Sequence, residues 1–317
     1  MRDVLVVVNP AAAAGRTGRA WSRLSARLRA AGLEFDVAMT SWPGEATELA
    51  RRAVRAGRPV VVAVGGDGTV NEVANGFFDG EEPIPTTTRL GVLPAGTGGD
   101  FRRTLGLPGP EAAVAALCRG RSRRLDVGRL RCTAPGGSSM LRHFVNVADA
   151  GIGGEVVARV NRGRGGGEAK RLLWRPLGGE LTFLLASLLT LVVWRNRPMR
   201  VVVDGEAREL VAQQVVVANG QYFGGGMRVA PLARPDDGLL DVVIAGDLRW
   251  RDNLRALTRV RRGTHLDLPG GKISFTRARR VEVSSPEPVR VDADGEQPGS
   301  LPAVFEVVPG ALEVICP

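Results

Sequence analysis

The sequence predicts a two-domain protein, an N-terminal Rossmann-like α/β domain followed by a C-terminal antiparallel β-sandwich domain. Up to about residue 125, short β-branched runs alternate with segments whose apolar residues recur at helical spacing. This alternation is typical of a parallel sheet covered by helices. After Asp126, strand-like runs follow one another and are separated by turn signals such as Asp204-Gly205, which indicates an antiparallel sheet. At 317 residues, the chain is also too long for one compact core.

The first domain is predicted to span residues 1–128. Its continuous apolar runs are typical of strands buried on both faces. Its helices are predicted from apolar residues at helical spacing that stop at a glycine or before a polar stretch. The predicted strands are 4–8, 35–39, 60–64 and 90–93. The predicted helices are 21–31, 45–55, a helix that begins near Val70, and 111–118.

The second domain is predicted to span residues 129–317, with the last residues able to pack back on the first domain. Its predicted helices lie near 180–194 and 249–262. The predicted strands, the first of which crosses the domain boundary, are 127–131, 144–148, 199–203, 215–218, 239–244, 281–284, 289–291 and 304–308.

Composition excludes several classes of site. The two histidines make a His-rich zinc site or a His-activated nucleophile implausible, and the single Gly-Lys pair runs into Ile273, which excludes a P-loop. Three widely separated cysteines form no disulfide framework, so we expect a reducing compartment. The formal net charge of +10 favours anionic partners, but no zinc finger or aromatic pattern supports nucleic acid. A GC-rich genome, which raises the arginine content, is the alternative explanation of the charge.

A glycine-rich loop follows the predicted strand at 60–64. Its sequence is Gly65-Gly66-Asp67-Gly68-Thr69, and a helix is predicted to begin just after it. The glycines let backbone N–H groups approach an anion, and the helix N-terminus adds positive potential. Asp67 would repel phosphate unless it helps to hold Mg²⁺, directly or through water. The alternative is a tight strand-to-helix turn with Asp67 as a cap.

A second loop of the same kind, Gly96-Thr97-Gly98-Gly99-Asp100, follows the predicted strand at 90–93. In a parallel sheet, the loops at the carboxyl ends of the strands lie at one edge, where ligands bind. We therefore expect both loops and Asn9-Pro10 to lie side by side. Two adjacent acidic glycine loops are difficult to explain as turns alone.

These motifs resemble the diacylglycerol kinase catalytic family, which includes bacterial lipid kinases, sphingosine kinases and ceramide kinases. The GGDGT motif is shared more distantly with NAD kinases and phosphofructokinases. The resemblance covers nearly the whole chain, in the expected order and spacing. Besides both loops, it rests on LDVG at 125–128, NVADAG at 146–151, ANG at 218–220, FGGG at 223–226, PDDGLLD at 235–241 and DGE at 294–296.

The resemblance implies ATP bound in a cleft between the two domains, with Mg²⁺ as the metal. It also implies that Asp67, Asp100 and Asp126 form an acidic network that organises the catalytic Mg²⁺. One departure stands out, because Gly99 occupies the place of the family's usual Asn before the acid of the second loop. The implied nucleotide-site residues are Asn9, Thr40, Gly65, Gly66, Asp67, Gly68, Thr69, Val70, Asn71 and Thr97.

A second, structural Mg²⁺ is implied in the turn at 234–239. By resemblance it would use Asp237 with the backbone oxygens of Arg234 and Leu239. From the residues alone, PDDG is equally well explained as a plain β-turn.

Glu296 is the implied general base. It follows the turn signal Asp294-Gly295, so we expect its carboxylate at a loop tip, with Asp292 as a helper. Without the other motifs, an exposed hairpin acid would be the simpler interpretation. The predicted function is ATP- and Mg²⁺-dependent phosphorylation of a lipid hydroxyl, with diacylglycerol as the favoured acceptor. The alternatives are another acceptor, such as a sphingoid base or NAD, and a nucleotide-binding regulator that has lost catalysis.

The expected partners are a membrane lipid substrate and an anionic membrane surface, with a homodimer left open. No export signal is visible, and the apolar run at 181–194 is shorter than the roughly 20 residues that span a bilayer. We therefore expect a cytoplasmic protein that is peripherally associated with the inner face of the membrane. Lys170, Arg171 and Arg175 precede that run, so segment 168–194 either faces lipid or packs on the β domain.

Overall fold

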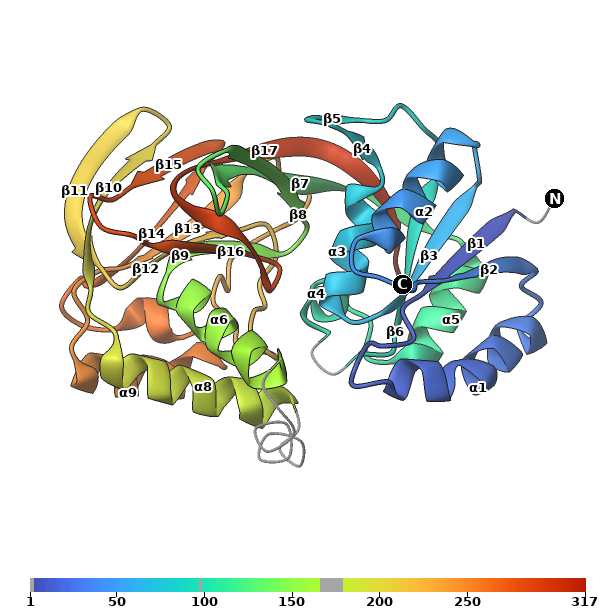
Figure 1. Cartoon of the computed structure of the whole chain (residues 1–317), viewed down its shortest axis with the longest axis horizontal. Coiled ribbons are helices and arrows are strands. Elements are labelled where there is room, and N and C mark those ends of the chain that lie inside the picture. Colours follow the sequence, from blue (N-terminus) through green and yellow to red (C-terminus); the bar gives the residue numbers. More distant parts are fainter. Residues whose placement is uncertain (1–2, 97–98, 166–178) are drawn as a thin grey trace. The chain divides into compact units, whose positions relative to one another are not determined.

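Two units, each with strands at its centre, make up the chain (Figure 1). Unit 1 comprises Met1–Val127 and Pro309–Pro317, and unit 2 comprises Gly128–Val308. The computed structural model describes residues 3–96, 99–165 and 179–317.

The sheet of unit 1 is parallel, in the order β2–β1–β3–β6–β17. The central strand β3 buries all six of its residues, on both faces, as its continuous apolar run predicted. The C-terminal end of the chain adds the last strand, where Val314 pairs with Leu90. The strand bounds are β1 Val4–Val8, β2 Phe35–Met39, β3 Val60–Gly65, β6 Arg89–Pro94 and β17 Glu296–Ile315.

Helices cover both faces of this sheet. Helices α1 and α5 pack on one face, where Leu28 and Leu117 line an apolar cavity with Val6 and Val62. Helices α2 and α3 contact one another and pack on β3. The bounds are α1 Arg16–Ala30, α2 Glu45–Arg55, α3 Asp67–Asn75, α4 Asp100–Thr104 and α5 Pro110–Arg119, and a small hairpin joins β4 Phe78–Asp79 to β5 Glu82–Pro83.

Two helices of unit 1 begin earlier than the apolar pattern predicts. Helix α1 begins at Arg16, and α3 begins at Asp67 rather than near Val70. In α3 the first turn is formed by the Asp-Gly-Thr part of the glycine loop itself. Polar and glycine residues at a helix start carry no apolar periodicity, so the sequence pattern misses the first turn.

Unit 2 is built mainly from antiparallel strands. Its main sheet has the order β14–β13–β12–β9–β16–β17, and β10 pairs with β11 and β15. The bounds are β7 Ser122–Thr133, β8 Ser139–Phe144, β9 Val147–Gly151, β10 Arg197–Val203, β11 Glu206–Ala212, β12 Gln214–Ala218, β13 Leu240–Ala245, β14 Ile273–Ala278, β15 Arg280–Ser284 and β16 Arg290–Ala293.

The main sheet of unit 2 is buried on both faces. In β12, Val215 and Val217 enter the core shared by the β-strands, whereas Val216 and Ala218 pack on the helical side. This division follows directly from the two-residue period of a strand. The helical side carries α6 Ile152–Gly165, α8 Gly179–Val193, α9 Trp250–Val260 and the short 3₁₀ helix η1 His265–Asp267.

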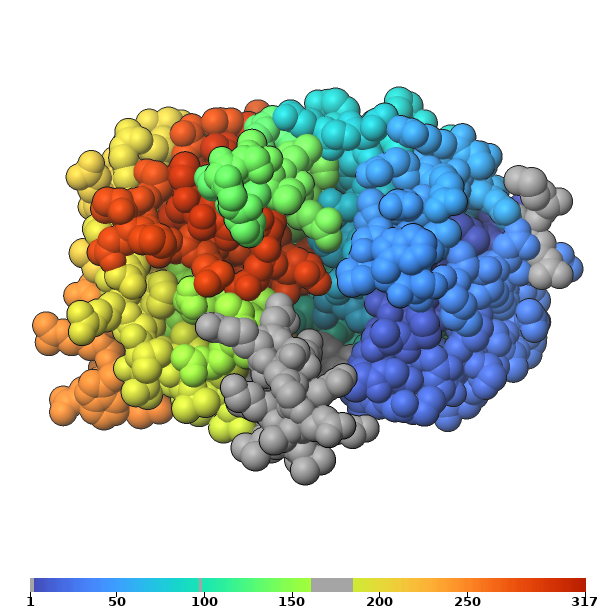
Figure 2. Space-filling view, in the orientation of Figure 1, coloured from blue at the N-terminus to red at the C-terminus, as the bar shows by residue number. Residues whose placement is uncertain are grey.

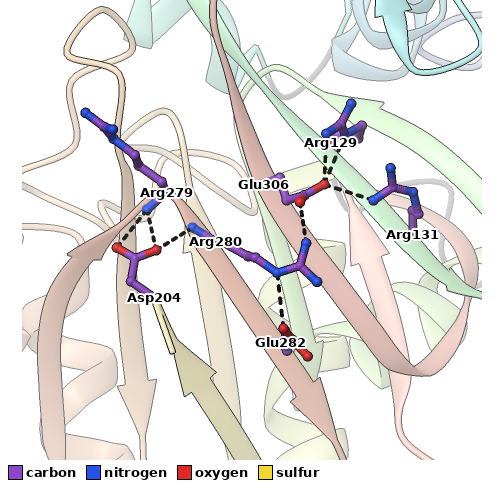
Figure 3. Close-up of polar contacts among 7 residues, drawn as sticks. All are labelled: Arg129, Arg131, Asp204, Arg279, Arg280, Glu282 and Glu306. Carbon is purple, nitrogen blue, oxygen red and sulfur yellow. Dashed lines mark hydrogen bonds and ion pairs between the residues drawn. The ribbon is translucent and has the colours of Figure 1, made fainter. Parts of the chain in front are cut away.

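Two carboxylates bind the arginines around the paired strands β15 and β17 (Figure 3). Asp204, in the turn between β10 and β11, accepts hydrogen bonds from the backbone N–H groups of Arg279 and Arg280. Glu306 lies in β17 and accepts side-chain hydrogen bonds from Arg129, Arg131 and Arg280. Arg280 is therefore held at both its backbone and its side chain.

Glu306 is a partly buried carboxylate with several cationic neighbours. Its side chain is 18% exposed, and both Arg129 and Arg131 lie 2.9 Å from Oε2. Burial raises the pKa of Glu306, but the hydrogen bonds from Arg129 and Arg280 outweigh burial and leave the pKa below its ordinary value. The ionised form of Glu306 therefore stabilises the folded state.

Glu306→Gln should lower the free energy of unfolding near neutral pH by about 1–3 kcal/mol, because it leaves three guanidinium groups without their charged acceptor. A carboxylate whose pKa is lowered in the folded state stabilises that state at pH values above its unfolded pKa of about 4.3. This stabilisation is lost as the pH falls through the folded pKa. Denaturant titrations should therefore show a smaller deficit near pH 3 than near neutral pH. Glu282→Gln, in an exposed pair with Arg280, is the matched control. Equal effects of the two substitutions would contradict the assignment.

Candidate functional site

The loop after β3 turns the chain directly into α3. Gly66 precedes the helix in an extended conformation, and no side chain caps that end of α3. Gly65 is forced to be glycine by its surroundings, because a Cβ there would lie 2.4 Å from Oγ1 of Thr69. The first backbone N–H groups of α3 have no acceptor within their own helix. Helix N-termini bind anions through such groups.

The second glycine loop lies against the first. The N–H groups of Ala95 and Gly96 donate to the carbonyl of Gly65, at 3.0 and 2.9 Å. A Cβ on Gly96 would lie 2.4 Å from Cα of Gly66, so the two backbones approach too closely for any other residue. The structure thus brings together the two loops that the sequence singled out.

Asp67 links these loops through its side chain. Its Oδ2 accepts the N–H of Gly99 at 2.8 Å, and its Oδ1 accepts the N–H of Phe101 at 3.0 Å. Gly99 has a φ of 68°, in the left-handed region that favours glycine. Asp67 is thus a cap, as the alternative interpretation held, but it caps α4 of the second loop instead of its own helix.

Asn9 lies at the same sheet edge as these loops. Its N–H donates to the carbonyl of Val64, and its side-chain amide donates to Oγ1 of Thr69 at 3.2 Å. The N–H of Thr40 donates to the carbonyl of Val8, so Thr40 follows directly on the neighbouring strand end. Asn9 therefore lies beside the first loop and Thr40 lies beside the end of β1, whereas Thr97 lies outside the described residues.

Asp100 and Asp126 are buried, and each has its own partner. Asp100 forms an ion pair with Arg103 at 2.8 Å, and Oδ1 of Asp126 accepts the N–H of Gly310 at 2.8 Å. Within residues 3–96, 99–165 and 179–317, no three acidic, histidine or cysteine side chains lie close enough to hold a metal together. The predicted acidic network of Asp67, Asp100 and Asp126 stays a prediction.

In unit 2, a two-residue hairpin turn presents Glu296. Asp294 and Gly295 have φ values of 50° and 86°, and Ala293 pairs with Glu296 across the turn. Positive φ at both central positions is the signature of the type I′ turn that Asp-Gly favours. Glu296 is the first residue of β17 and is exposed.

The side chain of Asp294 fixes this turn. Its Oδ2 accepts the N–H of Val145 at 2.7 Å, and its Oδ1 accepts the N–H groups of Asn146 and Val147, both at 3.0 Å. The N–H of Asp294 in turn donates to the carbonyl of Val147. The sequence predicted one strand over residues 144–148, but β8 ends at Phe144 and β9 begins at Val147 because these amides turn to the carboxylate.

Two asparagines connect this turn to the end of β12. The carbonyl of Asn146 accepts the N–H groups of Asn219 and Gly220, at 2.8 and 2.7 Å. The side-chain amide of Asn219 donates to the carbonyl of Val145 at 2.9 Å, and that of Asn146 donates to Tyr222. The motifs NVADAG, ANG and DGE are therefore one hydrogen-bonded cluster.

A pair of buried carboxyl groups lies next to the turn. Asp149 of β9 and Asp292 of β16 are register partners on adjacent strands, and both are fully buried. Asp292 accepts the N–H of Gly295 at 3.2 Å. Among the described residues, no donor forms a well-aligned hydrogen bond to either oxygen of Asp149. A Cβ on Gly153 would lie 2.4 Å from Oδ2 of Asp149, so the first turn of α6 closes over this carboxyl.

Burial dominates the ionisation of this pair. Burial raises the pKa of Asp149, against weaker opposing effects of Gln214 and the backbone of Gly154. Burial also raises the pKa of Asp292 well above its ordinary value, and the negative charge of Asp149 adds to the increase. Two carboxyl groups so close together cannot both ionise cheaply, so the pair holds a proton at higher pH than an exposed carboxyl would.

The PDDG segment forms a turn before β13. Oδ1 of Asp237 accepts the N–H of Leu239 at 3.2 Å, and Arg277 lies 3.2 Å from Oδ1 of Asp241. Burial raises the pKa of Asp241 to about 6, with Arg277 opposing and Asp237 reinforcing the rise. Oδ2 of Asp241 is buried and has no hydrogen-bond partner in the described part of the chain. An orphaned carboxylate oxygen near a second carboxylate is chemically suited to a hard cation.

Family models match both units. The model of the diacylglycerol kinase catalytic domain matches residues 3–130, and that of the YegS C-terminal NAD kinase beta sandwich-like domain matches residues 150–316. The chain belongs to the diacylglycerol kinase family. It is accordingly a kinase that acts on a lipid hydroxyl.

Curated relatives resemble the kinase over nearly their whole lengths. The diacylglycerol kinase of Mycobacterium tuberculosis H37Rv is 31% identical, over 99% of this chain and 95% of its own. That of Bacillus subtilis 168 is 27% identical, over 100% and 97%. A Chromohalobacter salexigens protein described as a YegS-like lipid kinase is 32% identical, over 92% and 86%.

Solved structures show the same two-domain fold of an α/β unit and a β-sandwich. A diacylglycerol kinase from Bacillus anthracis Sterne matches with a TM-score of 0.69 at 23% identity, covering 99% of this chain and 96% of its own. Another crystal structure from that organism matches with a TM-score of 0.74 at 26% identity, covering 99% and 97%. The predicted fold class is confirmed.

The buried pair leads to a stability prediction for the kinase. Because its folded pKa values are raised, stability is lost as pH rises from the unfolded value of about 3.9 through the folded pKa. Asp149→Asn removes one ionisable group, so it should raise the melting temperature near pH 8 and change it much less near pH 4. Thermal unfolding of both proteins over this range measures the effect, with the exposed Asp79→Asn as control. A uniform loss of stability at all pH values would contradict a shared proton.

Proposed function

We propose that the kinase transfers the γ-phosphoryl group of ATP to the hydroxyl of diacylglycerol, giving phosphatidic acid, and that it requires Mg²⁺. The observation that supports this most is the pair of glycine loops, which Asp67 ties together at the N-terminus of α3. The proposal brings these loops and Glu296 of unit 2 together around one bound nucleotide. The curated relatives named diacylglycerol kinase support the choice of acceptor.

The loops of unit 1 would bind the phosphates. Backbone N–H groups at the start of α3 and in the glycine loops would donate to phosphate oxygens, as at other helix termini that hold anions. Asn9 and Thr40 lie at the same sheet edge and would line the nucleotide beside them. Such a site works by alignment and charge neutralisation, because phosphoryl transfer asks little covalent chemistry of the protein.

Mg²⁺, when bound, would neutralise negative charge on the phosphates. Asp67, Asp100 and Asp126 each accept at least one protein donor, and a carboxylate has acceptor sites for several. No three such side chains among the described residues lie close enough to hold an ion together, so an ion bound here would also need oxygens of phosphate or water. A second ion would be held by Asp237 with the backbone oxygens of Arg234 and Leu239, beside the orphaned oxygen of Asp241.

Glu296 would take the proton of the lipid hydroxyl. The bond from the hydroxyl oxygen to the γ-phosphorus forms while the bond from that phosphorus to the departing ADP breaks. The carboxylate accepts the hydroxyl proton late in this step. Asp294 holds the turn with three hydrogen bonds, which fixes the backbone on which Glu296 stands. Asp292 assists by accepting the N–H of Gly295 in the same turn.

The same proposal places the kinase at the cytoplasmic face of an anionic membrane. Within the described ranges, no helix is both long enough and apolar enough to cross a bilayer. Of the segment 168–194 predicted to face lipid or to pack on the β domain, residues 168–178 lie outside the described residues, and the lipid contact stays a prediction. Homodimerisation stays a prediction.

Glu296→Gln should lower kcat by at least about 10²-fold while ATP affinity stays within about twofold, because only the proton acceptor is removed. Transfer of labelled phosphate and calorimetric titration with ATP measure the two quantities. Glu209→Gln, on the exposed strand β11, is the matched control. Retained turnover in Glu296→Gln would remove this residue from the mechanism.

Asp67→Ala should abolish transfer and weaken nucleotide binding, because both loops lose their shared acceptor and the metal network loses a carboxylate. The exposed Asp79→Ala serves as control. Full activity of the Asp67 variant at ordinary Mg²⁺ levels would refute this role.

Mass spectrometry of lipids incubated with enzyme and ATP identifies the acceptor. Phosphatidic acid is the expected product, with consumption of diacylglycerol. A phosphorylated sphingoid base or NADP would establish another acceptor, and the absence of any product with folded protein would favour a regulator without catalysis.

A further inference from the structure

Helix α9 is an amphipathic helix whose residues are all at least partly exposed. It has no buried residue; Trp250 is 70% exposed and Leu254 is 54% exposed. These two side chains are four residues apart and therefore lie on one face of the helix. Ala256, on another face, packs against the core beneath the sheet. The face of α9 that carries Trp250 and Leu254 is therefore exposed to solvent.

The end of α8 carries exposed apolar residues as well. Val192 is 85% exposed and Val193 is 65% exposed, and Leu189 lies on the same face by its spacing. Ala186 and Thr190 of the same helix are buried. Packing of α8 on α6 accounts for only one side of this helix.

A hydrogen-bonded link holds these two exposed regions in one neighbourhood. The side-chain amide of Asn196, three residues after α8, donates to Oδ1 of Asp247 at 2.8 Å and to the carbonyl of Leu248 at 3.1 Å. Leu248 is two residues before α9. Figure 1 shows both helices along the same edge of unit 2. We call Leu189, Val192, Val193, Trp250 and Leu254 the α8–α9 patch.

Arginines flank this patch. The stretch 249–262 contains six arginines and one acidic residue. Arg251, Arg255 and Arg259 follow at four-residue spacing on the face next to Trp250 and Leu254, and all three are exposed. The guanidinium of Arg251 lies 5.6 Å from the Trp250 ring centroid. The acidic residue, Asp252, is neutralised by Lys272 at 2.6 Å. In Figure 2, the orange atoms of this region protrude at the lower left.

We propose that the α8–α9 patch is the surface by which the kinase docks on an anionic lipid bilayer. Trp, Leu and Val would enter the boundary between headgroups and acyl chains, and the arginines would contact acidic headgroups. A second copy of this chain fits less well, because two such arginine rows would repel one another. The inference rests on the proposed function in one respect: a lipid acceptor resides in a bilayer, which the kinase must reach.

Cosedimentation with vesicles, without ATP, tests the surface independently of catalysis. Vesicles of neutral phosphatidylcholine are compared with vesicles that also contain phosphatidylglycerol. The full chain should bind the anionic vesicles and bind the neutral ones far less. The double variants Trp250→Ser/Leu254→Ser and Arg251→Ser/Arg255→Ser should each lower the partition coefficient by at least about tenfold. Trp42→Ser and Arg52→Ser, at exposed sites in unit 1, are the matched controls.

Turnover separates this surface from the catalytic site. The patch variants should retain the wild-type rate with a short-chain acceptor that dissolves as monomers, and should lose about tenfold with the same acceptor in anionic vesicles. Vesicle binding equal to wild type in both variants would overturn the inference. So would a change confined to self-association in sedimentation velocity, which would make the patch an interface between copies. Vesicle binding by the patch without turnover of any lipid would leave the surface standing and refute the proposed function.

Discussion

The capture of backbone N–H groups by single carboxylates is the interaction on which the glycine loops of unit 1 and the Asp294-Gly295 turn of unit 2 each depend. Asp67 accepts two amides of a loop about 30 residues later in the chain, and Asp294 accepts three amides about 150 residues earlier. Charge-assisted hydrogen bonds of this kind are stronger than neutral ones and define direction. In each unit, one acidic side chain thus decides the shape of a segment that lies far away in sequence.

Glycine makes this arrangement geometrically possible. Gly65 and Gly96 lie where a Cβ would collide with the neighbouring loop, and Gly99 adopts a left-handed conformation beside Asp67. The departure from the family pattern at position 99 is therefore compatible with this backbone, since the Asp67 contact uses the N–H of Gly99 and no side chain. The loops therefore owe their shape to the Asp67 carboxylate and to the close contact between their backbones.

Elements with a single dominant pattern were predictable from the sequence, and those that depend on distant partners were not. The β-branched run of β3 and the Asp294-Gly295 turn carry their own signals. Strand β11 reads as polar and is exposed, so only its pairing with β10 reveals it. Helix α6 begins with Ile-Gly-Gly, a poor helix start that becomes necessary because Asp149 lies beneath it. The register that places Asp149 opposite Asp292 likewise depends on the pairing of β9 with β16, which no local sequence pattern indicates.

The charge of the DGE turn follows from that register. Asp149, Asp292, Asp294 and Glu296 are close enough that Asp149, Asp294 and Glu296 each raise the pKa of Asp292, after burial. Apolar residues in place of Asp149 and Asp292 would remove this repulsion. They would also remove the carboxylate that accepts the Gly295 N–H. A carboxyl pair that retains one proton keeps that acceptor and carries at most one negative charge. The buried pair next to the turn therefore adds less negative charge than two ionised acids would, which is compatible with the proposal that Glu296 acts beside a phosphate group.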